Sequence, residues 1–345
     1  MRAYFLFTIF IFILAISSSL ITKEKGVLLF SRAHTNLLKG FAILTVLWGH
    51  IGSAYGIGGI QWIAGIGVSL FLLCSGYGLE ASFTKNGLAH FWKKRFIAVI
   101  IPYWIIYIIA AALTSDNFSF NLVIRILFFI QANWYVRYIL IIYIVYWALK
   151  QMSTYLKLSK KAFCFLLLAA FLIWFVIESL LFAKAGAPSL LARQMLSFPL
   201  GVIFFDYYAQ IKNAFLSNTF KNNLLFFLTG LISIFALGIG EINVIHNLPY
   251  IFSNTIALFT VMPLSLVTIK FSCLFYTFFN NYLFKFLGSV SYEIYLIQYF
   301  SRNIVTMSPI TLYLCFVFTL LISWLFYVSY NAITKKRSNA KVLKP

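Results

Sequence analysis

The sequence has very few acidic residues and few charged residues of any sign. Only 7 of its 345 residues are Asp or Glu, and charged residues make up 10% of the chain, against about a quarter in soluble domains. Apolar residues account for 62%, which is more than a soluble fold of this length would contain. This composition excludes an ordinary soluble domain and predicts an integral membrane protein.

Cysteine is also scarce, and its spacing offers no metal site. The four cysteines are far apart, each inside an apolar run: Cys74, Cys164, Cys273 and Cys315. No pair has the spacing of metal ligands, so we expect small buried side chains and no bound metal. The sequence shows no internal repeat, linker or soluble appendage, so any chemistry is expected inside the helical bundle.

Long apolar runs make up most of the sequence. A transmembrane helix needs about 20 mostly apolar residues. We therefore predict an all-α, polytopic transmembrane bundle of about 10–11 helices, formed by residues 4–22, 37–54, 61–83, 96–114, 133–150, 162–183, 190–208, 221–240, 250–269, 287–306 and 309–331. The apolar piece 118–131 is too short to span and is predicted to be interfacial or re-entrant. Ser308 and Pro309 are predicted to form the turn between the last two helices.

The net charge of +20 comes from short basic clusters between the apolar runs. No basic stripe follows a path that a phosphate backbone could take, so nucleic-acid binding is not expected. Placing Lys93, Lys94 and Arg95 in the cytoplasm assigns 21 of the 27 basic residues to that side, as the positive-inside rule requires. The C-terminus is then cytoplasmic. The basic residues left over are Arg2, Arg125, Arg137, Lys184, Arg193 and Arg302.

The first apolar segment has two interpretations. Arg2 and the serines at 17–19 are compatible with a signal peptide, and the alternative is an uncleaved helix with its N-terminus outside. Cleavage would leave the basic segment 23–39 outside, so we favour the uncleaved helix. The chain then divides into an additional N-terminal helix with a basic loop (1–35), a membrane domain (36–333) and a basic cytoplasmic tail (334–345).

Ionisable side chains at membrane depth are costly and therefore mark candidate sites. Lys39 and His50 are separated by eleven residues on one predicted helix, so both fall on the same face, about 16 Å apart along its axis. His50 could act as a general base, because a histidine titrates near neutral pH. The other interpretation is a histidine hydrogen-bonded between helices, with Lys39 as an interfacial anchor.

Two further candidate sites contain basic residues: one has an arginine near an aromatic residue, and the other has three basic residues in a row. Arg137 closely follows Trp134, which is typical of an interfacial anchor and also suits a contact with an anion or a sugar ring. Lys93, Lys94 and Arg95 fix the orientation of the chain. Side chains of this type at the cytoplasmic mouth could also hold phosphate groups.

A polar stripe runs along one late helix. Ser291, Tyr295, Gln298 and Arg302 recur at i, i+4, i+7 and i+11, which places them on one face. Such a stripe is expected to face the bundle interior or a water-filled cavity, unless it serves only to join helices. Glu293 lies deep in the same helix on another face.

These features together resemble acyltransferase family 3, a family of membrane proteins. The resemblance rests on five segments in the same order as in the family: 39–50 with its basic residue eleven positions before a histidine, the Ser-Gly-Tyr helix 67–77, the basic loop ending in Pro-Tyr at 91–103, the Trp-Tyr segment 133–137 and the Ser-Tyr helix 287–296. Each segment alone is weak, because apolar helices resemble one another. Five in register are more specific.

The resemblance implies a bacterial inner-membrane O-acyltransferase. Such enzymes take acyl groups, often acetyl, from cytoplasmic acyl-CoA and modify cell-surface glycans. His50 matches the family's essential histidine, Lys39 its basic partner and Arg95 the first basic residue of its loop. The chain departs from the family where a second loop arginine is often found, at Ala98, and where a late histidine is often found, at Gln298.

The sequence therefore predicts an acyl-CoA-dependent membrane enzyme in which His50 is catalytic. Donor phosphates are expected at Lys39, Lys94 and Arg95. The acceptor, a glycan or lipid-linked oligosaccharide, is expected at Trp134, Arg137, Ser291, Tyr295, Gln298 and Arg302. The alternative is a transporter or flippase of a lipid-linked sugar, which predicts two matching halves with paired charges near the midplane. The sequence shows no such symmetry.

Overall fold

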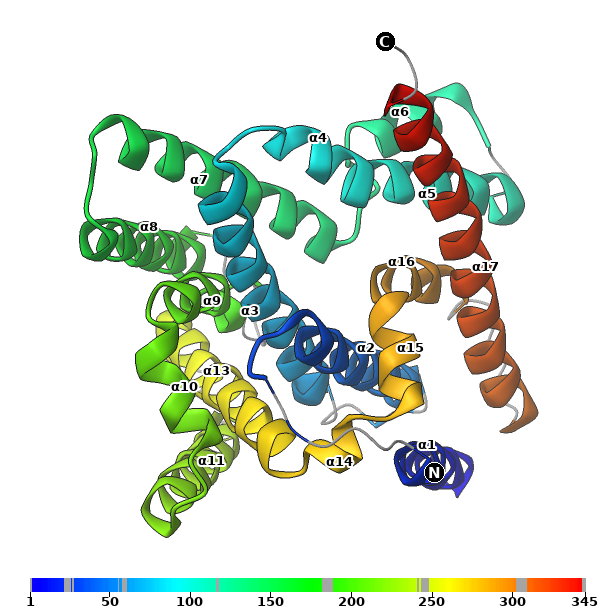
Figure 1. Cartoon of the computed structure of the whole chain (residues 1–345). Coiled ribbons are helices and arrows are strands. Elements are labelled where there is room, and N and C mark those ends of the chain that lie inside the picture. Colours follow the sequence, from blue (N-terminus) through cyan, green and yellow to red (C-terminus); the bar gives the residue numbers. More distant parts are fainter. Residues whose placement is uncertain are drawn as a thin grey trace.

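The computed structural model describes residues 2–342 apart from 22–25, 27, 55, 58–60, 116–117, 182–188, 241, 243–247 and 302–308, and it describes the side chains of these residues except at 54, 61, 301, 309 and 335–342. Within this part of the chain every regular element is a helix (Figure 1). The elements are α1 (Arg2–Leu20), α2 (Arg32–Ala54), α3 (Gln61–Asn86), α4 (Phe91–Arg95), the π-helix η2 (Phe96–Ile100), α5 (Ile101–Thr114), α6 (Phe120–Leu127), α7 (Trp134–Tyr155), α8 (Lys160–Leu181), the 3₁₀-helix η3 (Ala192–Gln194), α9 (Ser197–Asp206), α10 (Tyr208–Leu216), α11 (Phe220–Gly240), α13 (Tyr250–Leu274), α14 (Tyr276–Phe279), α15 (Tyr282–Ser289), α16 (Ser291–Ser301) and α17 (Pro309–Val342).

Long apolar helices make this a multi-pass membrane protein, and the predicted all-α bundle is confirmed. Among the described residues, seven helices are long and apolar enough to cross a membrane: Arg2–Leu20, Trp62–Asn86, Phe91–Thr114, Lys160–Leu181, Phe220–Gly240, Tyr250–Leu274 and Ile310–Thr334. The other predicted spans correspond to α2, α7 and two interrupted segments, α9–α10 and α15–α16. The helices of the two interrupted segments have only 8–11 residues each, which is too short for one of them to cross a membrane alone.

The helices differ sharply in how much of them is inside the protein. Within the apolar window of α3, 67% of residues are buried, whereas in α11 the share is 11%. Figure 1 shows α2 and α3 near the middle of the bundle, and α1, α8, α11 and α17 around its edge. Exposed side chains on α11, such as Phe227 and Phe235, are what a lipid-facing surface requires. The polar chemistry therefore lies on the central helices.

Reciprocal glycine contacts bring the central helices into close packing. A Cβ atom added at Gly40 of α2 would lie 2.0 Å from the backbone oxygen of Phe284 in α15, and one added at Gly288 would lie 2.0 Å from the backbone oxygen of Asn36. No larger residue fits at either position without moving backbone. An equivalent contact joins α3 and α9 through Gly76. Small residues of this kind are how membrane helices approach one another.

The first helix packs against the helix that carries the candidate catalytic histidine. The hydroxyl of Tyr4 donates to the backbone oxygen of Trp48 at 3.0 Å, and the Trp48 indole N–H donates to Thr8 at 2.9 Å. Tyr4 is buried. α1 is therefore bonded to α2 as part of the bundle.

Two predicted spans are interrupted. The sequence predicts one helix at 287–306, but α15 ends at Ser289 and α16 begins at Ser291, with Val290 between them in a non-helical conformation. The predicted span 190–208 is also broken: it contains the 3₁₀-helix η3 and the short helix α9, which ends at Asp206 and is separated from α10 by Tyr207. Hydropathy averages over many residues, so it does not reveal a break at a single residue.

A buried ion pair joins α3 and α7. The ammonium of Lys150 lies 2.5 Å from one carboxylate oxygen of Glu80, and the Tyr146 hydroxyl donates to the other at 2.8 Å. Both charged side chains are less than a tenth exposed. Lys270 is buried as well and donates to the backbone oxygens of Phe215 and Ser217. These two lysines therefore stabilise the fold in addition to any role at the membrane surface.

Candidate functional site

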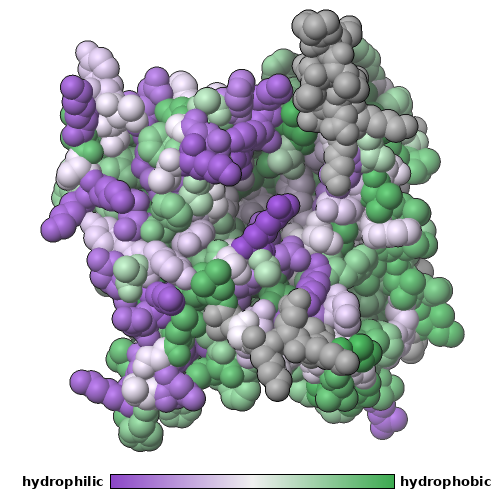
Figure 2. All heavy atoms as spheres, in the orientation of Figure 1, coloured by the Kyte–Doolittle hydropathy of each residue, from purple (hydrophilic) through white to green (hydrophobic). Residues whose placement is uncertain are grey.

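Two pockets meet at one tyrosine in the middle of the bundle. The larger, of about 320 Å³, is called the Lys39 pocket; it is lined by Lys39, Phe71, Cys74, Ser75, Gly78, Leu79, Arg95, Ala98, Val99, Tyr135, Tyr143, Ser291, Tyr292 and Tyr295. The smaller, of about 170 Å³, is called the His50 pocket; it is lined by Val46, His50, Ala64, Val68, Trp134, Leu190, Arg193 and Tyr295. Tyr295 belongs to both. The face of the molecule in Figure 2 is hollowed near its middle, and hydrophilic side chains gather around the hollow.

The geometry of α2 assigns one ionisable side chain to each pocket. Lys39 and His50 are both half-buried, and they line the Lys39 pocket and the His50 pocket, respectively. Eleven residues of α-helix bring the side chains back to nearly the same face, about 16 Å apart along the axis. Tight packing of α2 at Gly40 fixes that face relative to its neighbours. One helix face therefore connects the two pockets.

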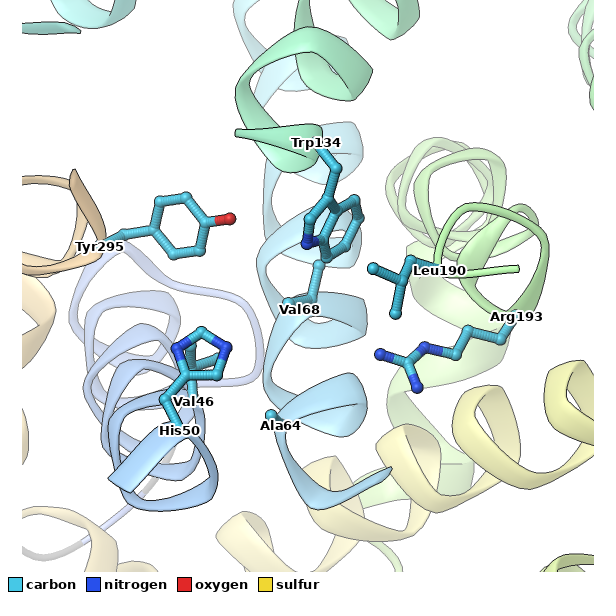
Figure 3. A pocket seen from close by; sticks show the side chains of 8 residues that line it. All are labelled: Val46, His50, Ala64, Val68, Trp134, Leu190, Arg193 and Tyr295. Carbon is cyan, nitrogen blue, oxygen red and sulfur yellow. The ribbon is translucent and has the colours of Figure 1, made fainter. Parts of the chain in front are cut away.

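Side chains from five helical elements line the His50 pocket. In Figure 3 the imidazole of His50 on α2 and the phenol of Tyr295 on α16 lie on one side of the space, and the guanidinium of Arg193 in η3 points into it from the other. Trp134 at the start of α7 closes a third side. Ala64, Val68 and Leu190 supply apolar walls. An imidazole and a guanidinium therefore face one small cavity that has both polar and apolar walls.

Arg95 is held in the Lys39 pocket by aromatic rings. Its guanidinium carbon lies 5.4 Å from the ring centroids of both Phe91 and Tyr143, within the range of cation–π attraction. The hydroxyl oxygen of Tyr143 is in turn 3.4 Å from the hydroxyl oxygen of Ser75. The half-buried side chain of Arg95 is thus positioned without a carboxylate partner among the described residues. Its charge remains available to an anionic ligand.

The π-helix η2 follows Arg95 directly. A π-turn is wider than an α-turn and is frequent at functional sites. Two tyrosine hydroxyls bond to backbone oxygens of this turn: Tyr292 to Val99 at 3.0 Å and Tyr330 to Ile97 at 2.6 Å. Since Tyr292 is in α16 and Tyr330 in α17, the two last helices fix the backbone next to Arg95.

Not all of the predicted donor-binding residues lie in the Lys39 pocket. Lys39 and Arg95 both line the Lys39 pocket, whereas Lys94 is exposed and is not among its lining residues. Ala98, at the position where the family often has a second arginine, lines the same pocket. The pocket therefore contains two of the three basic side chains that the sequence predicts for it.

The predicted acceptor residues are also divided. Trp134 lines the His50 pocket, and Ser291 lines the Lys39 pocket. Arg137 is exposed, and Gln298 is buried; neither is a lining residue of the two pockets. Arg302 lies outside the described residues.

Sequence reasoning did not single out Arg193 as a site residue. It was only counted among the basic residues outside the cytoplasmic clusters, yet its side chain lines the His50 pocket. The available signal was an arginine inside the predicted span 190–208, where a charged side chain is costly without a role. Glu80 was also missed, although it is one of only seven acidic residues and lies inside an apolar helix. Among the described residues, no three His, Cys, Asp or Glu side chains form a group that could hold a metal ion.

Comparison with known proteins identifies a family. Residues 34–328 match the family described as the acyltransferase domain of acyltransferase family 3. The matched segment contains most of the chain, from α2 into α17, and includes every residue that lines the two pockets. No curated protein and no solved structure matched the sequence. The match favours a group-transfer enzyme over a transporter.

Proposed function

Because the chain belongs to acyltransferase family 3 and is a membrane acyltransferase, we propose that it transfers an acetyl group from cytoplasmic acetyl-CoA to a hydroxyl group. That hydroxyl group belongs to a cell-envelope glycan or a lipid-linked sugar. The proposed location is the bacterial inner membrane, with the C-terminus in the cytoplasm, because 21 of the 27 basic residues then lie on the cytoplasmic side.

One observation carries the proposal: a pocket with two cationic side chains and a pocket with an imidazole meet at Tyr295. Lys39 and Arg95 suit the phosphates of coenzyme A, because ammonium and guanidinium groups form charge-assisted hydrogen bonds with phosphate oxygens. Exposed Lys94 would act at the entrance. The thin pantetheine arm would pass Tyr295, which brings the thioester to His50.

His50 acts as the general base in this proposal. Its imidazole accepts the proton of the acceptor hydroxyl while the hydroxyl oxygen attacks the thioester carbonyl carbon. The tetrahedral intermediate collapses by breaking the carbon–sulfur bond, and the thiolate of coenzyme A takes the proton from the imidazolium. The products are an ester and free coenzyme A, and His50 is neutral again.

The dimensions of the His50 pocket support a small acyl group. A cavity of about 170 Å³ that must also admit the acceptor hydroxyl has little room for a long acyl chain. Trp134 offers an indole face on which a sugar ring can pack, and aromatic rings with polar atoms are common in such contacts. Arg137, Gln298 and Arg302 are proposed as further contacts of the acceptor, whereas Ser291 lines the Lys39 pocket on the donor side of Tyr295.

The experiment compares surface glycans from cells in which the gene has been deleted and then replaced by the wild-type gene, by His50→Ala or by His90→Asn. His90 is an exposed histidine with φ of 58° in the loop before α4, and asparagine tolerates that conformation. Mass spectrometry is expected to show one acetyl mass per modified unit with the wild type and His90→Asn and none with His50→Ala, at equal protein abundance. Normal acetylation in the His50→Ala cells would refute the proposal.

A further inference from the structure

Arg193 faces the histidine across the His50 pocket. It belongs to the short helix η3 between α8 and α9, and its guanidinium points into the space that His50 borders from the opposite side (Figure 3). A Cβ atom added at Gly65 of α3 would lie 3.5 Å from the guanidinium carbon. That separation is an ordinary van der Waals contact, so the guanidinium lies close beside α3 at Gly65.

The charge of Arg193 has no compensating group among the described residues. Its Nε atom is buried without a hydrogen-bond partner, and no described carboxylate lies within 4.0 Å of the side chain. Neighbouring Ala64, Val68 and Leu190 are apolar. A cation in such surroundings costs free energy, and this cost is offset when a ligand brings negative charge to the pocket.

We infer that Arg193 stabilises the negative charge that develops on the thioester carbonyl oxygen during transfer; this inference rests on the proposed function. As the acceptor oxygen forms its bond to the carbonyl carbon, the electron pair of the carbon–oxygen double bond moves onto the carbonyl oxygen, and His50 takes the hydroxyl proton. Arg193 donates hydrogen bonds to that oxyanion. When the double bond re-forms, the carbon–sulfur bond breaks, and the departing thiolate takes the proton from His50.

The position of Arg193 favours an oxyanion over an anionic group elsewhere on the acceptor. General base and guanidinium border one cavity of about 170 Å³, so a carbonyl within reach of His50 is also close to Arg193. The guanidinium lies beside Gly65 of α3 and already points into the cavity. Fixed donors in an apolar site are effective because they need no reorganisation as charge develops, and removing one typically lowers kcat about 10²- to 10³-fold.

The test measures release of free coenzyme A thiol from acetyl-CoA by the full-length protein, both in membrane vesicles that contain the native acceptor and after purification without acceptor. The variants are Arg193→Gln, Arg193→Ala, His50→Ala and, as a matched control, Arg125→Gln, which changes an exposed arginine on α6. Water replaces the acceptor hydroxyl in the purified sample. Oxyanion stabilisation assists attack by either nucleophile, whereas a contact with the acceptor assists transfer alone.

We expect Arg193→Gln to lower kcat about 10²- to 10³-fold in vesicles, with little change in the KM for acetyl-CoA. Where the purified wild type hydrolyses acetyl-CoA, purified Arg193→Gln should do so more slowly by a similar factor. Added guanidinium ion is expected to restore part of the activity of Arg193→Ala, which a purely structural role would not allow. Wild-type rates in Arg193→Gln, a loss confined to transfer while hydrolysis persists, or no rescue by guanidinium would each overturn the inference. The proposed function fails separately, if wild type and His50→Ala release equal amounts of coenzyme A in vesicles.

Discussion

The rings of Tyr135 and Tyr295 lie 4.8 Å apart, centroid to centroid, at the junction of the two pockets. Tyr135 extends from α7 and lines the Lys39 pocket, and Tyr295 extends from α16 and lines both. Both side chains are buried. On the proposed route a thioester passes this pair on its way from Lys39 to His50, so the two rings are in a position to control entry of the donor and of water.

Replacing Tyr295 by alanine is expected to join the two pockets into one. Water would then reach the thioester more easily, and the enzyme would hydrolyse a larger share of acetyl-CoA instead of transferring the acetyl group. The measurement is the ratio of coenzyme A released to acetyl groups found on the glycan. Tyr295→Phe keeps the ring and is the control. An unchanged ratio in Tyr295→Ala would show that the tyrosine does not separate the pockets.

Replacing Arg95 by glutamine is expected to weaken donor binding. A hydrogen bond to a charged group contributes about 1.5–3 kcal/mol, so the KM for acetyl-CoA should rise on the order of 10- to 100-fold. Lys93→Gln changes an exposed cation of the same loop that does not line the pocket and should raise KM far less. Equal effects of the two substitutions would mean that the loop acts only through its overall charge.

The ion pair of Glu80 and Lys150 is expected to stabilise the fold without affecting chemistry. Removing one partner of a buried pair leaves an uncompensated charge and costs about 3–5 kcal/mol. Glu80→Gln and Lys150→Met should each lower the thermal unfolding temperature of the detergent-purified protein, and the double variant should lower it by less than the two changes combined. The KM for acetyl-CoA should stay the same in all three. Additive losses would indicate that the two groups do not interact.

Replacing Gly40 by alanine is expected to disrupt the contact between α2 and α15. The added methyl group would overlap the backbone oxygen of Phe284 at 2.0 Å, and overpacking of this kind costs about 1–3 kcal/mol. Gly238→Ala in α11 is the matched control, because nothing lies within 4 Å of its added Cβ. Thermal unfolding of the two variants, monitored by size-exclusion chromatography, compares their stability. Equal unfolding temperatures would contradict the close approach of the two helices.

Parts of this structure follow from the sequence for physical reasons. Apolar runs must form helices in a bilayer, because each backbone polar group needs a partner within its own segment. The shared face of Lys39 and His50 follows from helical periodicity. Such local rules relate residues on one helix, so they predicted the two ends of the proposed route.

Other parts depend on contacts between residues far apart in the chain. The proximity of Tyr135 and Tyr295 and the position of Arg193 opposite His50 arise from how α2, α7, α16 and η3 pack, which no local pattern encodes. The break at Val290 was missed because hydropathy averages over a whole segment and does not reveal a single non-helical residue. Lys150 was counted only among the basic residues of the cytoplasmic side, since its partner Glu80 is 70 residues away.

The hydrogen bond from Tyr330 to the backbone oxygen of Ile97 joins residues 233 positions apart. During synthesis the segment that carries Arg95 therefore leaves the ribosome long before its partner on α17. Until that helix is made, the turn beside Arg95 lacks one of its two tyrosine bonds. We expect the site for the thioester donor to be completed only when the last helix has inserted, so an unfinished polypeptide would consume little acetyl-CoA.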